Sequence, residues 1–115
     1  RDNVVKDKSL EFAVRIVNLY KFLVNEQKEF VMSKQILRSG TSIGANIREA
    51  EQAQSRADFI NKLNIALKEA NETEYWLELL IRTEYITREQ YESINNDSTE
   101  INKLLISIIK TTKNY

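Results

Sequence analysis

The chain has 115 residues with 17 basic and 17 acidic side chains, so its formal net charge is zero, and residues 1–115 suit one domain with a single core. Apolar residues make up 42% and charged residues 30%, with no proline and two glycines, which predicts a folded protein of long helices. The absence of cysteine and histidine excludes disulfides, cysteine-ligated metals and catalytic Ser-His or Cys-His pairs.

Apolar residues at helical spacing predict the first two helices. Phe12, Ile16 and Leu23 lie on one face of a helix over about residues 4–24. A polar connector follows this helix. The next amphipathic segment predicts a second helix over about residues 31–53.

Start signals mark the third and fourth helices. Ser55 and Asp58 form an S-x-x-D pattern, in which the Ser side chain accepts from a free backbone N–H, so a helix is predicted over about residues 56–84. A T-x-x-Q pattern beginning at Thr87 repeats the signal and predicts a last helix over about residues 88–113. Short connectors return each helix along its neighbour, so the whole chain is predicted to be all-α, an antiparallel up-down-up-down four-helix bundle.

The predicted topology separates the charges along the bundle. One end, the basic end, gathers residues 1–10, 45–62 and 103–115, with nine basic and five acidic side chains and a balance of +4. The opposite, acidic end gathers residues 24–34 and 72–92, with four basic and eight acidic side chains and a balance of −4. The chain is therefore neutral only on average.

Two interpretations of this charge separation remain open. The ends can be solvated surface whose mixed charge keeps the protein soluble. Alternatively, the basic end offers a face to phosphate backbones or to an acidic partner. On the second interpretation, the candidate polyanion-binding residues are Arg48, Arg56 and Lys62.

The second predicted helix contains an unusual stretch, RSGTSIGANIREAEQ, over residues 38–52. Gly40 and Gly44 each weaken a helix by about 0.5 to 1 kcal/mol relative to alanine, so we expect another helix to pack closely against them. About 100° around the helix from its apolar face runs a second stripe of small and polar residues. This polar stripe consists of Ser39, Ser42, Asn46 and Glu49.

Three interpretations of the polar stripe remain open: an internal hydrogen-bond network, a subunit interface, and an active site built on Glu49. The third would need a metal that the sequence does not visibly hold, so we expect no enzyme, no cofactor and no metal site. Trp76 is the candidate interface aromatic, because it cannot easily share the core direction with the adjacent Tyr75.

At the stretch from Arg38 to Ala50 the chain resembles a known family. The sequence RSGTSIGANIREA is similar to the signature R-x-x-x-S-I-x-x-N-I-x-E-G/A of the bacterial four-helix-bundle family named for the 23S rRNA intervening sequence. The later segment LNIALKEA, from Leu63 to Ala70, resembles a second family motif. The resemblance covers about residues 9–113 and implies a bundle that assembles into a homopentameric ring.

The resemblance extends to accessory proteins of diversity-generating retroelements, basic pentamers that bind a reverse transcriptase and nucleic acid. This chain departs from them in being neutral, which argues against strong nucleic-acid binding unless a ring sets five basic ends side by side. We therefore expect a non-enzymatic homo-oligomeric scaffold whose partner is RNA or a nucleic-acid-associated protein. The alternative is an accessory protein-binding module for a neighbouring enzyme, such as a reverse transcriptase, without direct nucleic-acid binding.

The location is expected to be cytoplasmic, without a membrane partner. No apolar run reaches the roughly 20 residues that span a bilayer. Residues 1–12 also lack the apolar core of a signal peptide.

Overall fold

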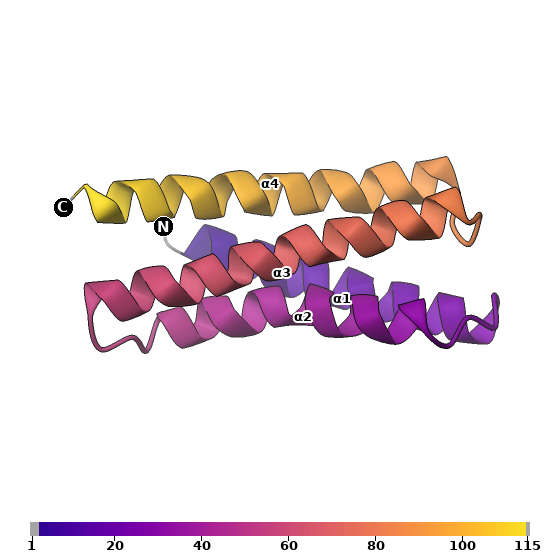
Figure 1. Cartoon of the computed structure of the whole chain (residues 1–115), viewed down its shortest axis with the longest axis horizontal. Helices are drawn as coiled ribbons and strands as arrows, with labels where there is room; N and C mark the ends of the chain where they lie inside the picture. The colour runs from indigo at the N-terminus through magenta and orange to yellow at the C-terminus, as the bar shows by residue number, and fades with distance from the viewer. Residues whose placement is uncertain (1–2, 115) are drawn as a thin grey trace.

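A computed structural model describes residues 3–114 and contains four α-helices (Figure 1). They are α1 (Asn3–Asn25), α2 (Met32–Ala50), α3 (Arg56–Arg82) and α4 (Arg88–Lys113). Successive helices run in alternating directions, so both ends of the chain lie at one end of the bundle, together with the α2–α3 connector. This end is the basic end, and the other two connectors lie at the acidic end. The predicted all-α fold of four helices is confirmed.

Two helices end earlier than predicted. The second helix was expected to reach residue 53 but ends at Ala50, because the backbone N–H groups of Glu51 and Gln52 bond to carbonyls three residues back, at 3.2 and 3.0 Å. Hydrogen bonds that span three residues, where an α-helix spans four, tighten the chain into a turn. The third helix was expected to reach residue 84 but ends at Arg82, since Glu84 adopts a left-handed φ of 66°.

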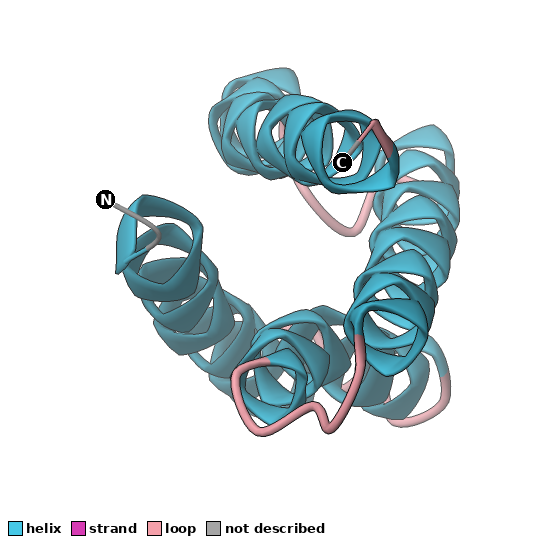
Figure 2. Ribbon diagram, turned by 90° about the vertical axis from the view of Figure 1, so that its left-hand side faces the viewer, coloured by secondary structure: helices cyan, strands magenta, loops and turns pink. Residues whose placement is uncertain are grey.

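The four helices surround one core in chain order, as the view along the bundle shows (Figure 2). The residues that are fully buried include Phe12, Ile16, Leu23, Ile36, Ile43, Leu63, Leu77, Leu80, Ile101 and Leu105. α1 and α4 pack against each other less closely than α2 and α3 do. Exposed polar contacts span this seam, including a 2.7 Å ion pair between Arg15 and Asp97.

The two glycines of α2 allow α1 to approach closely. A Cβ atom added to Gly40 would lie 2.7 Å from Cγ1 of Ile16, which is inside contact distance. A Cβ atom on Gly44 would lie 3.3 Å from Oγ of Ser9. The expectation that another helix packs against the glycines is confirmed, and the structure identifies that helix as α1.

Both predicted helix starts are confirmed by their side-chain caps. The Ser55 hydroxyl accepts from the backbone N–H of Asp58 at 3.0 Å. At the start of α4, the Thr87 hydroxyl accepts from Gln90 N–H at 3.1 Å, and the Gln90 side chain accepts from Thr87 N–H at 2.8 Å. Each bond satisfies a backbone donor that the first helical turn leaves free.

The start of α2 uses a carboxylate that the sequence analysis did not identify. Glu29 is 7% exposed, and its carboxylate accepts from the backbone N–H groups of Val31, Met32 and Ser33 at 3.1, 2.9 and 2.7 Å. Burial raises the pKa of Glu29, but these hydrogen bonds outweigh burial, so its pKa is lowered overall. The cap holds the α1–α2 connector in place at the acidic end.

Candidate functional site

The polar stripe of α2 is buried at one end. Ser39 is 1% exposed, and its hydroxyl lies 2.9 Å from that of Thr73 on α3, within hydrogen-bond distance. Thr73 is itself fully buried and also donates to the backbone carbonyl of Glu69 at 2.8 Å. This pair of hydroxyls ties α2 to α3 inside the bundle.

The middle of the stripe is half-buried and bonds to its own helix. The Ser42 hydroxyl donates to the Arg38 carbonyl at 2.6 Å, and the Asn46 amide donates to the Ser42 carbonyl at 2.9 Å. At the far end of the stripe, the exposed carboxylate of Glu49 pairs with Lys62 of α3 at 3.1 Å. The stripe therefore contacts α3 at its two ends and leaves Ser42 and Asn46 between them.

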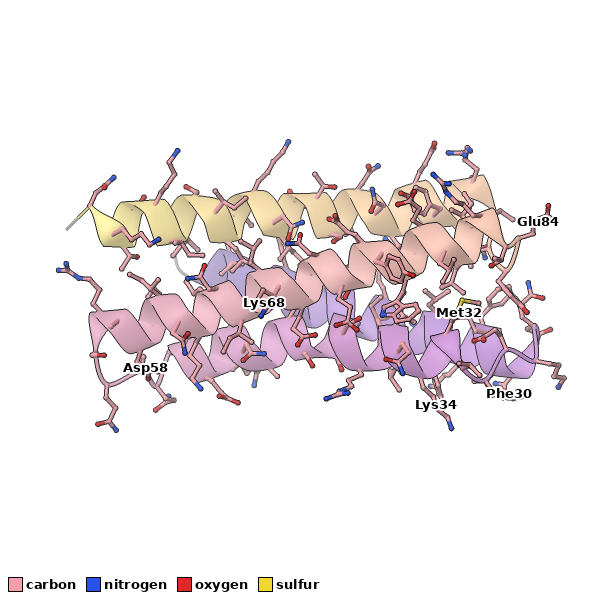
Figure 3. The ribbon with its side chains drawn as sticks, viewed as in Figure 1. Phe30, Met32, Lys34, Asp58, Lys68 and Glu84 are labelled. Carbon is pink, nitrogen blue, oxygen red and sulfur yellow. The ribbon has the colours of Figure 1, made fainter. Side chains whose placement is uncertain are left out.

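The structure places the three candidate polyanion-binding residues at the basic end but gives them different surroundings. Lys62 is half-buried and neutralised by Glu49. Arg48 and Arg56 are exposed, and within residues 3–114 neither forms an ion pair. Figure 3 labels Asp58 near the basic end and Glu84 at the acidic end.

The candidate interface aromatic lies on α3. The indole N–H of Trp76 donates to the carboxylate of Glu72 at 3.0 Å, and its ring packs edge-to-face on Tyr75 with centroids 5.0 Å apart. Trp76 is half-buried against the core, whereas Tyr75 is 58% exposed. Of the two rings, Tyr75 is therefore the more exposed to solvent.

A second polar network, between α3 and α4, was missed by the sequence analysis. The Glu74 carboxylate accepts from the Ser98 hydroxyl at 3.1 Å and from the Asn102 amide at 2.7 Å. Ser98 is fully buried at a position where the helical spacing calls for an apolar residue. A serine at that position was the feature of the sequence that could have predicted the network. The network joins the two helices at mid-length.

Residues 3–114 contain no group of three or more Asp or Glu side chains placed to hold a metal ion. None of the helices described is long and apolar enough to cross a membrane.

Comparison with known proteins decides the family. A model of the 23S rRNA-intervening sequence protein family matches residues 1–107, which include the motif from Arg38 to Ala50. The chain belongs to this family. The 23S rRNA-intervening sequence protein fold is also seen in a crystal structure of a protein with unknown function from the S23 ribosomal protein family of Bacteroides thetaiotaomicron VPI-5482. Its sequence is 98% identical to this one. The match covers 94% of the present chain and 93% of the crystallised chain, with a TM-score of 0.91. No curated protein matches the chain.

Proposed function

We propose that this family member is a non-enzymatic scaffold that assembles into a homopentameric ring and presents its basic ends to RNA. The observation that carries the proposal is the pair of exposed arginines at the basic end, Arg48 and Arg56, which have no ion-pair partner within residues 3–114. Lys62 contributes less than the sequence predicted, because Glu49 already neutralises it. Guanidinium groups without an internal partner are suited to phosphate oxygens.

A ring is needed because one chain has no net charge. A balance of +4 at one end of a single bundle gives few phosphate contacts, so few counterions are released in total. Five such ends held side by side would raise the local charge fivefold. We assign the subunit contact to the outward part of the polar stripe, where the small side chain of Ser42 allows a neighbouring helix to approach closely and the Asn46 amide can reach across.

The assembly is tested by light scattering on the purified protein at low and high salt. We expect a salt-stable particle of five times the 13.5 kDa chain mass. Asn46→Leu should change that mass while the protein stays helical. An unchanged mass with lowered stability would assign the stripe to an internal network instead.

RNA binding is tested on the same sample with a labelled RNA. Affinity should fall steeply between low and physiological salt, and the double variant Arg48→Glu with Arg56→Glu should abolish binding. The matched control is Arg82→Glu with Arg88→Glu, two exposed arginines at the acidic end, each paired with a glutamate of its own helix. Binding that ignores salt, or that both double variants weaken equally, would contradict the proposal.

A second candidate function is a protein-binding module, an accessory subunit of a neighbouring enzyme such as a reverse transcriptase. The exposed ring of Tyr75, held edge-to-face by Trp76, favours it, because aromatic anchors often dominate protein interfaces. Such a partner should stay bound at high salt and be lost with Tyr75→Ala. Retention of the partner by this variant would exclude the aromatic pair as the docking site.

A further inference from the structure

The basic end of the bundle is hollow. A cavity of about 840 Å³ opens there, lined by residues from all four helices and from the α2–α3 connector. Its apolar lining includes buried side chains, such as Val5, Ile47 and Leu63, each 5% exposed or less, and the half-buried Phe59 and Ile108. This volume lies in the range of small-molecule sites, about 300 to 1,000 Å³, which are also mostly apolar with a few polar groups.

The charged groups at the mouth of the cavity leave one cation available. Glu51 and Arg56 are the charged residues of the lining. The Glu51 carboxylate is held by Lys6 of α1 at 3.3 Å. Arg56 is exposed and has no ion-pair partner in the described part of the chain, and hydroxyl groups such as that of Thr111 complete the rim. The unpaired Arg56 therefore favours an anionic group at the mouth, and the apolar lining favours a hydrocarbon group inside.

We propose that this cavity binds a linear aliphatic carboxylate, with its hydrocarbon chain against the half-buried Phe59 and Ile108 and its carboxylate on Arg56. Hydrocarbon placed over these side chains leaves water, which is favourable in proportion to the area covered. A carboxylate matches the two parallel N–H donors of a guanidinium. A bare phosphate or an RNA backbone can use Arg56 but has no apolar part to fill the cavity.

The test is calorimetric titration of the purified protein, without RNA, using hexanoate, octanoate and decanoate below their micelle concentrations. Each added CH₂ should tighten binding about fourfold, so decanoate binds far more tightly than hexanoate. Decylammonium, which has the same chain and the opposite charge, should bind at least tenfold more weakly than decanoate. Affinity independent of chain length would overturn the proposal.

Two variants locate the site. Arg56→Gln should weaken decanoate binding about tenfold, whereas Arg88→Gln, which changes the equivalent first residue of α4 at the acidic end, should leave it unchanged. Ala53→Phe, which places a large ring in the cavity lining, should abolish binding. If Ala53→Phe fails to fold, methyl NMR shifts of Val5, Ile47 and Leu63 on decanoate addition provide the same information. Shifts confined to other parts of the bundle would overturn the site.

The result is independent of the proposed RNA function. Binding of decanoate without binding of RNA would support the cavity assignment and contradict the proposed RNA function. A protein that binds RNA but shows no saturable binding of any carboxylate refutes the cavity assignment alone.

Discussion

The two ends of the bundle are built from the same four helices but are closed in different ways. At the acidic end the two connectors meet, since the Gln27 amide donates to the Tyr85 carbonyl at 3.0 Å, and Ile86 fills the space beneath with 5% exposure. The groove that remains there has about 450 Å³. At the basic end, where a single connector lies, there is a cavity of about 840 Å³. The end where two connectors meet therefore has the smaller hollow.

The ion pairs differ between the ends as well. At the basic end, Lys62 of α3 pairs with Glu49 of α2, and Lys6 of α1 pairs with Glu51 in the turn after α2, so both pairs link segments far apart in the chain. At the acidic end, the pairs of Arg82 and Arg88 join residues four apart on one helix. Exposed pairs of either kind contribute about 1 kcal/mol or less. Apolar contacts, rather than these pairs, should account for any large difference in stability between the ends.

The largest expected effect comes from the apolar side chain that seals the acidic end. Ile86→Ala removes a buried side chain and should lower the free energy of unfolding by about 2 to 5 kcal/mol. The matched change at the basic end, Ile108→Ala, should cost less than half as much, because Ile108 is half-buried and faces the cavity. Urea unfolding followed by circular dichroism measures both. Equal losses would show that the basic end is sealed as well as the acidic end.

The next effect concerns how closely α1 approaches α2 along the bundle. Gly40→Ala gains about 0.5 to 1 kcal/mol of helix propensity but pushes a methyl group into the buried Ile16, and overpacking of this kind typically costs about 1 to 3 kcal/mol. We expect a net loss of about 1 kcal/mol in urea unfolding. Gly44→Ala, nearer the basic end, meets Ser9 at 3.3 Å and should stay within about 1 kcal/mol of the unchanged protein. A more stable Gly40→Ala variant would show that Ile16 can move aside.

Local patterns in the sequence were enough to predict the helices and several of their boundaries. The spacing of apolar residues and the side chains of Ser55 and Thr87 act within one or two turns, so the sequence alone identifies them. The glycines of α2 predicted a close approach, but only the packed structure shows that the approaching helix is α1. Glycine leaves room without specifying which neighbour uses it.

The rest of the site depended on contacts between distant residues. Ser39 and Glu49 lie on one predicted stripe, yet the first is bonded inside the bundle and the second is exposed and paired with Lys62. A helical wheel gives the direction of a side chain but not how far the neighbouring helix extends beyond it. The cavity at the basic end was not predictable for the same reason, because its lining comes from all four helices and the α2–α3 connector.

A smaller effect, dependent on pH, is expected from Glu29 at the acidic end. The folded protein lowers the pKa of Glu29 below its ordinary 4.5, so its contribution to stability is present above pH 4.5 and is lost as the pH falls through the folded pKa. Glu29→Ala should cost about 0.5 to 2 kcal/mol at pH 7 and less at pH 3, because protonation of the carboxylate removes part of the cap. Urea unfolding at both pH values measures this, with the exposed Glu26→Ala as control. A cost that does not change with pH would mean that the carboxylate charge is unimportant to the cap.

The smallest effect is a gain in stability at the same end. Glu84 has a left-handed φ of 66° after α3, where its N–H bonds to the Ile81 carbonyl at 3.0 Å and Tyr85 N–H bonds to the Leu80 carbonyl at 2.9 Å. Glycine usually occupies this position of the motif, because a side chain there costs about 1 kcal/mol. Glu84→Gly should therefore raise the free energy of unfolding by up to about 1 kcal/mol.

Glu84→Ala separates backbone strain from charge in this last prediction. It removes the same negative charge from an end whose balance is −4 but keeps a Cβ atom in the left-handed region. If strain is the cause, only the glycine variant gains stability in thermal or urea unfolding. If both variants gain equally, repulsion among the carboxylates of the acidic end is the cause. The charge difference between the ends would then affect stability directly, in addition to any role in choosing a partner.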